Sequence, residues 1–403
     1  MNRADLKQEI GNWLYMLLIF LFVADPTNTI LHAKNPLFAL FFCYNLAFFR
    51  ADWRKLVYFF IPVLAITLSW IIAMMRGVVV DADELKGVYT AFLPMVLLMW
   101  NDRYDVVRLS TVPVVFTATI VIVLFWVIFF VPQLEHPIYV YMMKHGGTIM
   151  MTNRYFIGVK LFCMYPKSTV AFLPVFGWAL YNFIKSKKYT VANVLPVVVL
   201  LHMFLISGTR SSILLPVLLA AVVLFIYCRN KRYLNYIFYP AFALFIFLFV
   251  VLLAMLLLES NEYSNMVKYG HLTSYVELFS ENPHYMLIGQ GPATDFYSKG
   301  FSGFTLKTEW TYLEMLRNYG LLCIPILYVL LCPIFALMRR EGRDDSVLAM
   351  CLTYIIYLVI AGTNPLLLSS TGMLVLLSMY SYVGRVERNL SSKGEELHKI
   401  KNC

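Results

Sequence analysis

Arg210 lies between two apolar segments, in the sequence SGTRSS (207–212). Residues 191–206 before it and 213–227 after it are almost wholly apolar. An arginine at the centre of a membrane-spanning helix costs roughly 2.5–3.5 kcal/mol, so we expect Arg210 at a membrane interface or at a functional site. The serine, glycine and threonine before it favour a turn, and a neighbouring hydroxyl can cap the following helix. An arginine at a helix N-terminus suits a phosphate or pyrophosphate, whereas an interface arginine without a ligand is the alternative.

Further isolated cations precede other apolar segments. Arg154, Lys160 and Lys167 lie in the segment 152–172, which contains no acidic residue. Such a group suits an anionic ligand at the membrane surface, and attraction to lipid headgroups is the alternative. Arg76 begins the short polar segment 76–87, which also carries an Asp-x-Asp pair. A hard metal ion would require more oxygen ligands than this pair supplies.

The longest polar segment, 259–320, contains the candidate general base. Its last part, TEWTYLEMLRNYGLL (308–322), is typical of a helix that leads into an apolar span. Glu309 lies at the start of this helix, where a carboxylate can act as a general base for a sugar hydroxyl. A carboxylate that favours the helix N-terminus is the simpler interpretation. Tyr312 can stack on a sugar ring, although an interfacial aromatic belt also explains it.

The composition requires that these residues be positioned by membrane helices. The chain of 403 residues is 60% hydrophobic and 14% charged, with a mean hydropathy of +0.70. Soluble domains are roughly a quarter charged, so we predict an all-α polytopic membrane protein. The net charge of +10 is spread over many short segments, which indicates topology and excludes nucleic acid as the expected partner. The seven cysteines form no C-x-x-C pair, so neither a disulfide framework nor a zinc site is expected.

We predict about 12 transmembrane helices in a single transmembrane domain, 1–403, with a long external loop at 259–320 between helices 9 and 10. The first segment reads as a retained span rather than a cleaved signal peptide. Short basic segments alternate with less basic ones, which places both termini and the tail 384–403 in the cytoplasm. The approximate cores of the spans are 12–24, 36–49, 56–75, 88–100, 111–132, 167–184, 191–206, 213–227, 236–258, 321–337, 346–361 and 371–383.

Three segments of the chain resemble the bacterial O-antigen polymerase and ligase superfamily, the Wzy-type membrane glycosyltransferases. SGTRSS resembles the Ser-Gly-(Ser/Thr)-Arg turn of this family. Arg154, Gly158 and the sequence YPKS (165–168) resemble its Arg…Gly…Pro-Asn segment. The stretch from His271 to Gly291, followed by TEWTYLEMLRNYGLL, resembles its long periplasmic loop. The resemblance extends over most of the chain in architecture, but these motifs are short.

The resemblance implies an enzyme of the inner membrane that joins oligosaccharide repeat units carried on undecaprenyl pyrophosphate. Its product would be O-antigen or a related surface or capsular polysaccharide of the lipopolysaccharide pathway. Arg210 and Arg154 are expected to hold the pyrophosphate, and Glu309 to act as base. The residues expected to bind pyrophosphate or sugar are Arg76, Lys160, Lys167, His271 and Tyr312. No metal and no cofactor are expected, because the pyrophosphate leaves readily. A chain-length regulator and the lipid bilayer are the further partners considered.

Three alternatives stay open at this point. An O-antigen ligase transfers finished polymer to lipid A core; ligases of the family typically have a histidine where this chain has Glu309, which favours a polymerase. A flippase or carrier also has about twelve spans, but carriers tend to place their charges at the middle of the membrane. A membrane acyltransferase would need a histidine–carboxylate pair, which the external histidines do not form in any recognisable motif.

Overall fold

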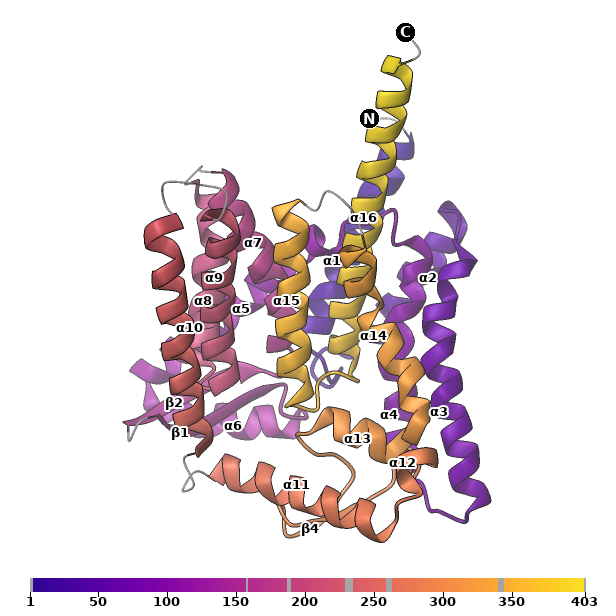
Figure 1. Ribbon diagram of the computed structural model, residues 1–403, viewed down its shortest axis with the longest axis vertical. Coiled ribbons are helices and arrows are strands. Elements are labelled where there is room, and N and C mark those ends of the chain that lie inside the picture. The colour runs from indigo at the N-terminus through magenta and orange to yellow at the C-terminus, as the bar shows by residue number, and fades with distance from the viewer. Residues whose placement is uncertain are drawn as a thin grey trace.

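The structure, a computed structural model, describes residues 3–156, 159–186, 190–228, 235–258, 263–339 and 344–401. Long helices run side by side as a bundle, and short helices and two β hairpins lie at one end of it (Figure 1). The two ends of the chain lie at the other end of the bundle. We call these two regions the loop end and the terminal end.

The elements of the N-terminal half form the first helices of the bundle and the first hairpin. In chain order they are α1 (Arg3–Ala24), α2 (Lys34–Phe48), η1 (Trp53–Leu56), α3 (Val57–Met75), α4 (Ala82–Phe92), η2 (Leu93–Trp100), α5 (Val106–Phe130), η3 (Pro132–Leu134), α6 (Glu135–Lys144), β1 (Ile149–Phe156), β2 (Val159–Pro166), η4 (Thr169–Ala171) and α7 (Phe172–Ser186).

The C-terminal half completes the bundle and supplies the structured part of the long loop. Its elements are α8 (Val191–Ile206), α9 (Arg210–Cys228), α10 (Asn235–Leu258), α11 (Tyr263–Glu281), α12 (Tyr285–Ile288), β3 (Phe296–Ser298), β4 (Gly303–Thr305), α13 (Thr311–Tyr319), η5 (Gly320–Leu322), α14 (Cys323–Met338), α15 (Asp345–Gly362) and α16 (Ser370–Lys401).

Apolar helices give the chain the character of a membrane protein. Among the described ranges, five helical segments are long and apolar enough to cross a membrane, by length and composition alone. They are Ala4–Ala24, Trp53–Met75, Val106–Phe130, Thr311–Met338 and Asp345–Gly362. The helices Val191–Ile206, Ser212–Cys228 and Tyr239–Val251 are apolar but shorter. These segments support the predicted all-α membrane class, whereas the number of twelve spans stays a prediction.

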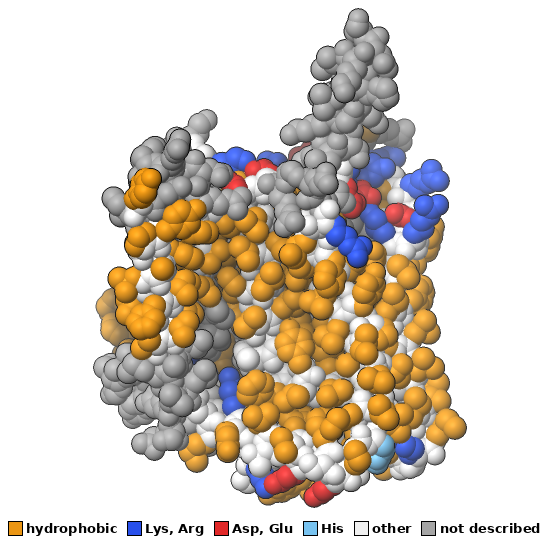
Figure 2. Space-filling model, in the orientation of Figure 1, with side chains coloured by type: hydrophobic (Ala, Val, Ile, Leu, Met, Phe, Trp, Pro, Cys, Tyr) orange, Lys and Arg blue, Asp and Glu red, His pale blue; other side chains and the backbone are white. Residues whose placement is uncertain are grey.

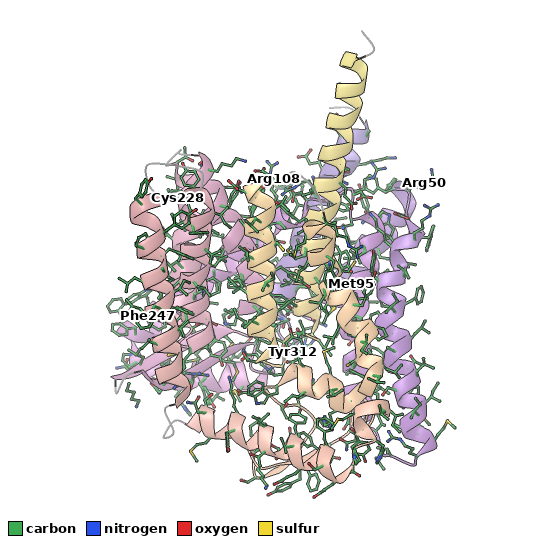
Figure 3. The ribbon with its side chains drawn as sticks, viewed as in Figure 1. Arg50, Met95, Arg108, Cys228, Phe247 and Tyr312 are labelled. Atoms are coloured by element: carbon green, nitrogen blue, oxygen red, sulfur yellow. The ribbon has the colours of Figure 1, made fainter. Side chains whose placement is uncertain are left out.

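The surface separates apolar and charged side chains. On the face that Figure 2 shows, apolar side chains form a broad band along the bundle; most of the Lys and Arg side chains lie at the terminal end, and a few charged side chains lie at the loop end. Arg50 and Arg108 lie at the terminal end, Phe247 lies on the side of the bundle, and Tyr312 lies towards the loop end (Figure 3). Such a band is the surface that a helix bundle presents to lipid.

The C-terminal tail continues the last helix of the bundle. α16 runs without interruption to Lys401 and projects beyond the other helices (Figure 1). Arg385 forms an ion pair with Asp105, which precedes α5, and Arg388 Nη1 lies 3.3 Å from Asp102 Oδ1. These ion pairs join the base of the tail to the segment that connects η2 to α5. The backbone of the tail is helical as far as Lys401.

The long loop is folded around a small core of its own. Tyr275 and Phe279 of α11 pack against Phe296 of β3, and the ring centroids of Tyr275 and Phe296 lie 5.1 Å apart. Tyr275 also shares a 2.7 Å hydrogen bond with the hydroxyl of Thr308, and burial raises the pKa of Tyr275 to about 12. Residues 259–262 lie outside the described residues. The rest of this segment is an ordered unit that can hold a site.

Candidate functional site

The turn before α9 is locked against β2. Gly208 has a φ of +62°, a conformation that favours glycine, and a Cβ at this position would lie 1.9 Å from Cys163 Sγ. Thr209 Oγ1 accepts a 3.3 Å hydrogen bond from the backbone N–H of Ser212 and so caps α9, as the sequence predicts. Arg210 is therefore the first residue of α9 and follows a turn that has little freedom to move.

Arg210 contacts the long loop. Its Nη1 donates a 3.2 Å hydrogen bond to Asn265 Oδ1 in the first turn of α11, and the side chain is half-buried. The guanidinium lies at the N-terminus of α9, where unpaired backbone N–H groups also favour an anion. Two residues that are 55 positions apart in the sequence thus meet at the loop end.

Glu309 is held by the same end of α11. Glu309 Oε2 lies 3.3 Å from Lys268 Nζ, and both side chains are about one-third exposed. Lys268 follows Asn265 by three residues, so the two side chains project from neighbouring positions on the helix. Arg210 and Glu309 consequently contact two residues of α11 that lie three positions, or about one turn, apart. We call Arg154, Arg210, Asn265, Lys268 and Glu309 the arginine site.

Arg154 approaches this site from the β1–β2 hairpin. Arg154 pairs with Leu161 across the hairpin, and its side chain is half-buried. Burial raises the pKa of Cys163, and the positive charge and backbone N–H of Arg154 act in the opposite direction. Since Cys163 also contacts Gly208, the hairpin links Arg154 to the turn that carries Arg210. Gly158 lies outside the described residues.

The other lysines of the sequence prediction are not brought into the arginine site by any contact recorded for the described residues. Lys160 is exposed near the tip of the hairpin. Lys167 Nζ donates a 2.5 Å hydrogen bond to the carbonyl oxygen of Gly146. Burial lowers the pKa of Lys167, and the nearby Lys307 lowers it further. Lys167 therefore shares its neighbourhood with Lys307 of the long loop.

The guanidinium of Arg76 is hydrogen-bonded to the backbone of the long loop. Its Nη2 donates hydrogen bonds of 2.7 and 2.8 Å to the carbonyl oxygens of Gly289 and Gln290, and its guanidinium lies 5.6 Å from the ring centroid of Tyr285. A Cβ at Gly289 would lie 2.5 Å from the carbonyl oxygen of Asn318. The glycine-rich turn of the long loop therefore allows close backbone packing, and Arg76 fixes it to the end of α3.

The side chains of His271 and Tyr312 also form hydrogen bonds within the protein. The imidazole Nδ1 of His271 lies 2.5 Å from Ser298 Oγ, the side chain is buried, and its Nε2 has no hydrogen-bond partner. Burial lowers the pKa of His271, and the negative charge of Glu309 acts against this effect. The hydroxyl of Tyr312 donates a 2.8 Å hydrogen bond to the carbonyl oxygen of Leu358. It thereby ties α13 to α15.

A cavity of about 690 Å³ lies at the loop end, and Lys307 in its wall precedes Glu309 of the arginine site by two residues. Its wall includes Lys34, α4, Lys307 and one face of α13, on which Glu314 and Asn318 lie. Sequence reasoning did not single out Glu314, Asn265 or Lys268. Asn265 and Lys268 lie on α11 eight residues or fewer before His271, where a helical pattern extended backwards from 271 would have indicated one shared face.

The arginine site combines groups that can hold an anion with a group that can accept a proton. Two arginines and a helix N-terminus can hold an anion, and a carboxylate can accept a proton. In the part of the chain that the structure describes, no group of three or more His, Cys, Asp or Glu side chains has a geometry that could hold a metal ion. Comparison with protein-family models, with characterised proteins and with solved structures found no match.

Proposed function

We propose that this protein is a polysaccharide polymerase of the bacterial inner membrane. It joins oligosaccharide repeat units carried on undecaprenyl pyrophosphate, which yields O-antigen or a related surface polysaccharide. One observation carries the proposal: Arg210, at the N-terminus of α9, contacts the helix of the long loop that also binds Glu309 through Lys268. An anion-binding group and a carboxylate are thereby held on one element, as a transfer from a pyrophosphate requires.

The reaction uses the two kinds of group in different ways. The bond between the sugar anomeric carbon and the pyrophosphate oxygen breaks, and a hydroxyl oxygen of a second repeat unit bonds to that carbon. The proton of this hydroxyl passes to the carboxylate of Glu309, and undecaprenyl pyrophosphate is released. Arg210 and Arg154 stabilise the charge on the leaving pyrophosphate, at about 1.5–3 kcal/mol for each charge-assisted hydrogen bond.

The proposal assigns the loop end to the periplasm and both termini to the cytoplasm. Basic side chains gather at the terminal end (Figure 2), as they do at the cytoplasmic ends of membrane helices. The basic segments 229–234 and 340–343 lie outside the described residues, so only their sequence supports this orientation. The undecaprenyl chain would lie in the bilayer against the apolar sides of the bundle, and a chain-length regulator is a proposed partner.

Two observations favour a polymerase over the alternatives. The residue that pairs with Lys268 is Glu309, whereas ligases of the resembled family typically have a histidine at that position. Arg154, Arg210 and Lys268 belong to elements at the loop end rather than to the middle of the bundle, which argues against a carrier with a charged site at mid-membrane.

The test uses a strain that lacks this gene and compares its surface polysaccharide on a gel after complementation. The variants are Arg210→Ala, Arg210→Lys and Glu309→Gln. The control is Arg54→Ala, the same change at an exposed arginine of the terminal end. We expect single repeat units on lipid A core from Arg210→Ala and Glu309→Gln, partial ladders from Arg210→Lys, and full ladders from the control.

Other outcomes contradict the proposal. Bare core with polymer retained on undecaprenyl pyrophosphate would identify a ligase. A full ladder from Arg210→Ala, with the protein present in the membrane, would exclude the assigned role of this arginine. Loss of repeat units from the periplasmic side would identify a transporter.

A further inference from the structure

The cavity of about 690 Å³ differs from the arginine site in charge. Three ammonium groups and three carboxylates contribute to its wall: Lys34, Lys86 and Lys307, and Asp83, Glu84 and Glu314. Lys307 Nζ lies 2.5 Å from Glu84 Oε1, so one pair is already neutralised. The wall therefore carries no net charge. A pyrophosphate requires a surplus of positive charge, which this wall does not provide.

The wall nevertheless presents many hydrogen-bonding groups. Glu314 uses Oε2 to accept a 2.7 Å hydrogen bond from the backbone N–H of Thr308, and its Oε1 accepts none within the described residues. The side chains of Asp83, Lys86 and Ser370 also line the cavity and have no hydrogen-bond or ion-pair partner among the described residues. Asn318 is only 7% exposed, and its Oδ1 has no hydrogen-bond partner. Unused donors and acceptors of both kinds suit a ligand with many hydroxyl groups.

Apolar surface is present on the same wall. Phe22 and Phe38 line the cavity, as do Pro94 and Pro365. Aromatic rings and prolines can pack against the C–H face of a sugar ring. The volume lies within the range of about 300–1,000 Å³ that ligand cavities occupy.

One position in the wall provides room for a probe substitution. Gly87 lies in α4 and lines the cavity, and a Cβ placed there would meet no atom within 4 Å. Its φ is not in the left-handed region, so other residues can adopt its conformation. A large side chain at this position would extend into open space without displacing the fold.

We propose that this cavity binds an uncharged, hydroxyl-rich carbohydrate, with Glu314 accepting a hydrogen bond from a sugar hydroxyl. The inference deepens the proposed function, on which it rests for the source of the sugar. It assigns the glycan of a repeat unit to the cavity and the pyrophosphate to the arginine site. Lys307 lines the cavity, and Glu309 of the arginine site follows it by two residues, so one short segment of the long loop connects the two regions.

The experiment measures binding without turnover. The full-length protein in lipid nanodiscs is titrated with fluorescently labelled, phosphate-free oligosaccharide released by mild acid from the surface polysaccharide of its own host. The variants are Gly87→Trp, which places a large side chain at the wall of the cavity, and Glu314→Gln, which keeps the shape of the side chain. Gly87→Ala is the matched control, since it adds a single methyl group at the same position.

We expect Gly87→Trp to weaken binding at least tenfold and Glu314→Gln to weaken it about tenfold. Gly87→Ala should bind within about twofold of the unchanged protein, and inorganic pyrophosphate should not compete. Unchanged affinity in Gly87→Trp, absence of saturable binding by the unchanged protein, or competition by pyrophosphate would overturn the inference. Because no polymer is formed in this assay, a failure here is distinct from a failure of the proposed reaction.

Discussion

Arg317 provides the sharpest prediction about how the long loop is held together. Its side chain is fully buried, with 0% exposure. Nη1 donates hydrogen bonds of 2.9 Å to Gln290 Oε1 and 2.8 Å to the carbonyl oxygen of Thr294, and Nη2 donates one of 3.0 Å to the carbonyl oxygen of Leu306. The guanidinium also lies 4.4 Å from the ring centroid of Phe296. One side chain thus joins three segments of the loop.

The substitution Arg317→Met keeps most of the apolar stem and removes all three donors. Each acceptor left unpaired costs about 1 kcal/mol or more, so we expect the free energy of opening of this loop to fall by about 3 kcal/mol. A change of this size increases the population of the open loop roughly a hundredfold. We use about 1 kcal/mol for each acceptor, the lower end of the range, because burying the charged guanidinium in the unchanged protein itself costs free energy.

Hydrogen exchange of peptides from 285–319 measures this opening directly. The matched control is Lys299→Met, which removes an exposed lysine whose partner is Glu277. Exposed ion pairs contribute about 0–1 kcal/mol, so the control should change exchange little. Equal exchange in Arg317→Met and the unchanged protein, or an equal effect from Lys299→Met, would refute the assignment of Arg317 as the centre of the loop.

Two further predictions concern the turn before α9 and the buried histidine. Gly208→Ala should shorten the polysaccharide ladder although Arg210 is retained, because a Cβ would lie 1.9 Å from Cys163 Sγ and the φ is +62°; a full ladder at equal protein level would contradict this. Burial lowers the pKa of His271 from its ordinary value of 6.5. Between these two pKa values the unfolded loop binds more protons than the folded loop does. The folded loop therefore loses stability as the pH falls below about 6.5 and through the lowered pKa. Hydrogen exchange, corrected for intrinsic rates, should therefore increase between about pH 7.5 and pH 5.5, and His271→Gln should abolish the increase; the same pH dependence in this variant would exclude His271 as its source.

Helix positions could be predicted from the sequence because apolar runs and the residues that end them are local. The predicted span 191–206 coincides with α8, and a helix occupies each of the other predicted span positions. Within the fourth predicted span, however, residues 93–100 form a 3-10 helix rather than an α-helix. Run length alone did not distinguish these states.

Features that depend on distant contacts could not be predicted in the same way. The β1–β2 hairpin pairs Ile149 with Pro166, although the sequence led us to predict an all-α protein. Arg76 lies 213 residues before Gly289, whose carbonyl oxygen it binds, so its spacing gave no sign of this contact. The sequence around an isolated cation does not show whether its partner is a ligand or a backbone carbonyl oxygen.

In the candidate site, too, the features set by adjacent residues could be predicted, whereas those set by distant contacts could not. Arg210 and its capping threonine were predicted from a short motif, because a turn and a helix start are encoded by adjacent residues. Asn265 and Lys268 were missed, since only the packing of α11 against the start of α9 and against Glu309 gives them a role. The cavity was missed for the same reason, because its wall combines residues of α1, α2, α4 and α13 with segments that are far apart in the sequence.

The central claim is tested most directly by reconstituting the reaction. The purified protein in lipid vesicles would be given undecaprenyl-pyrophosphate-linked repeat units, and the products resolved by length. The account predicts glycans of two or more repeats together with released undecaprenyl pyrophosphate, and neither product from Arg210→Ala. Repeat units that cross the membrane unchanged, that are joined only to added lipid A core, or that lengthen equally with Arg210→Ala would contradict it.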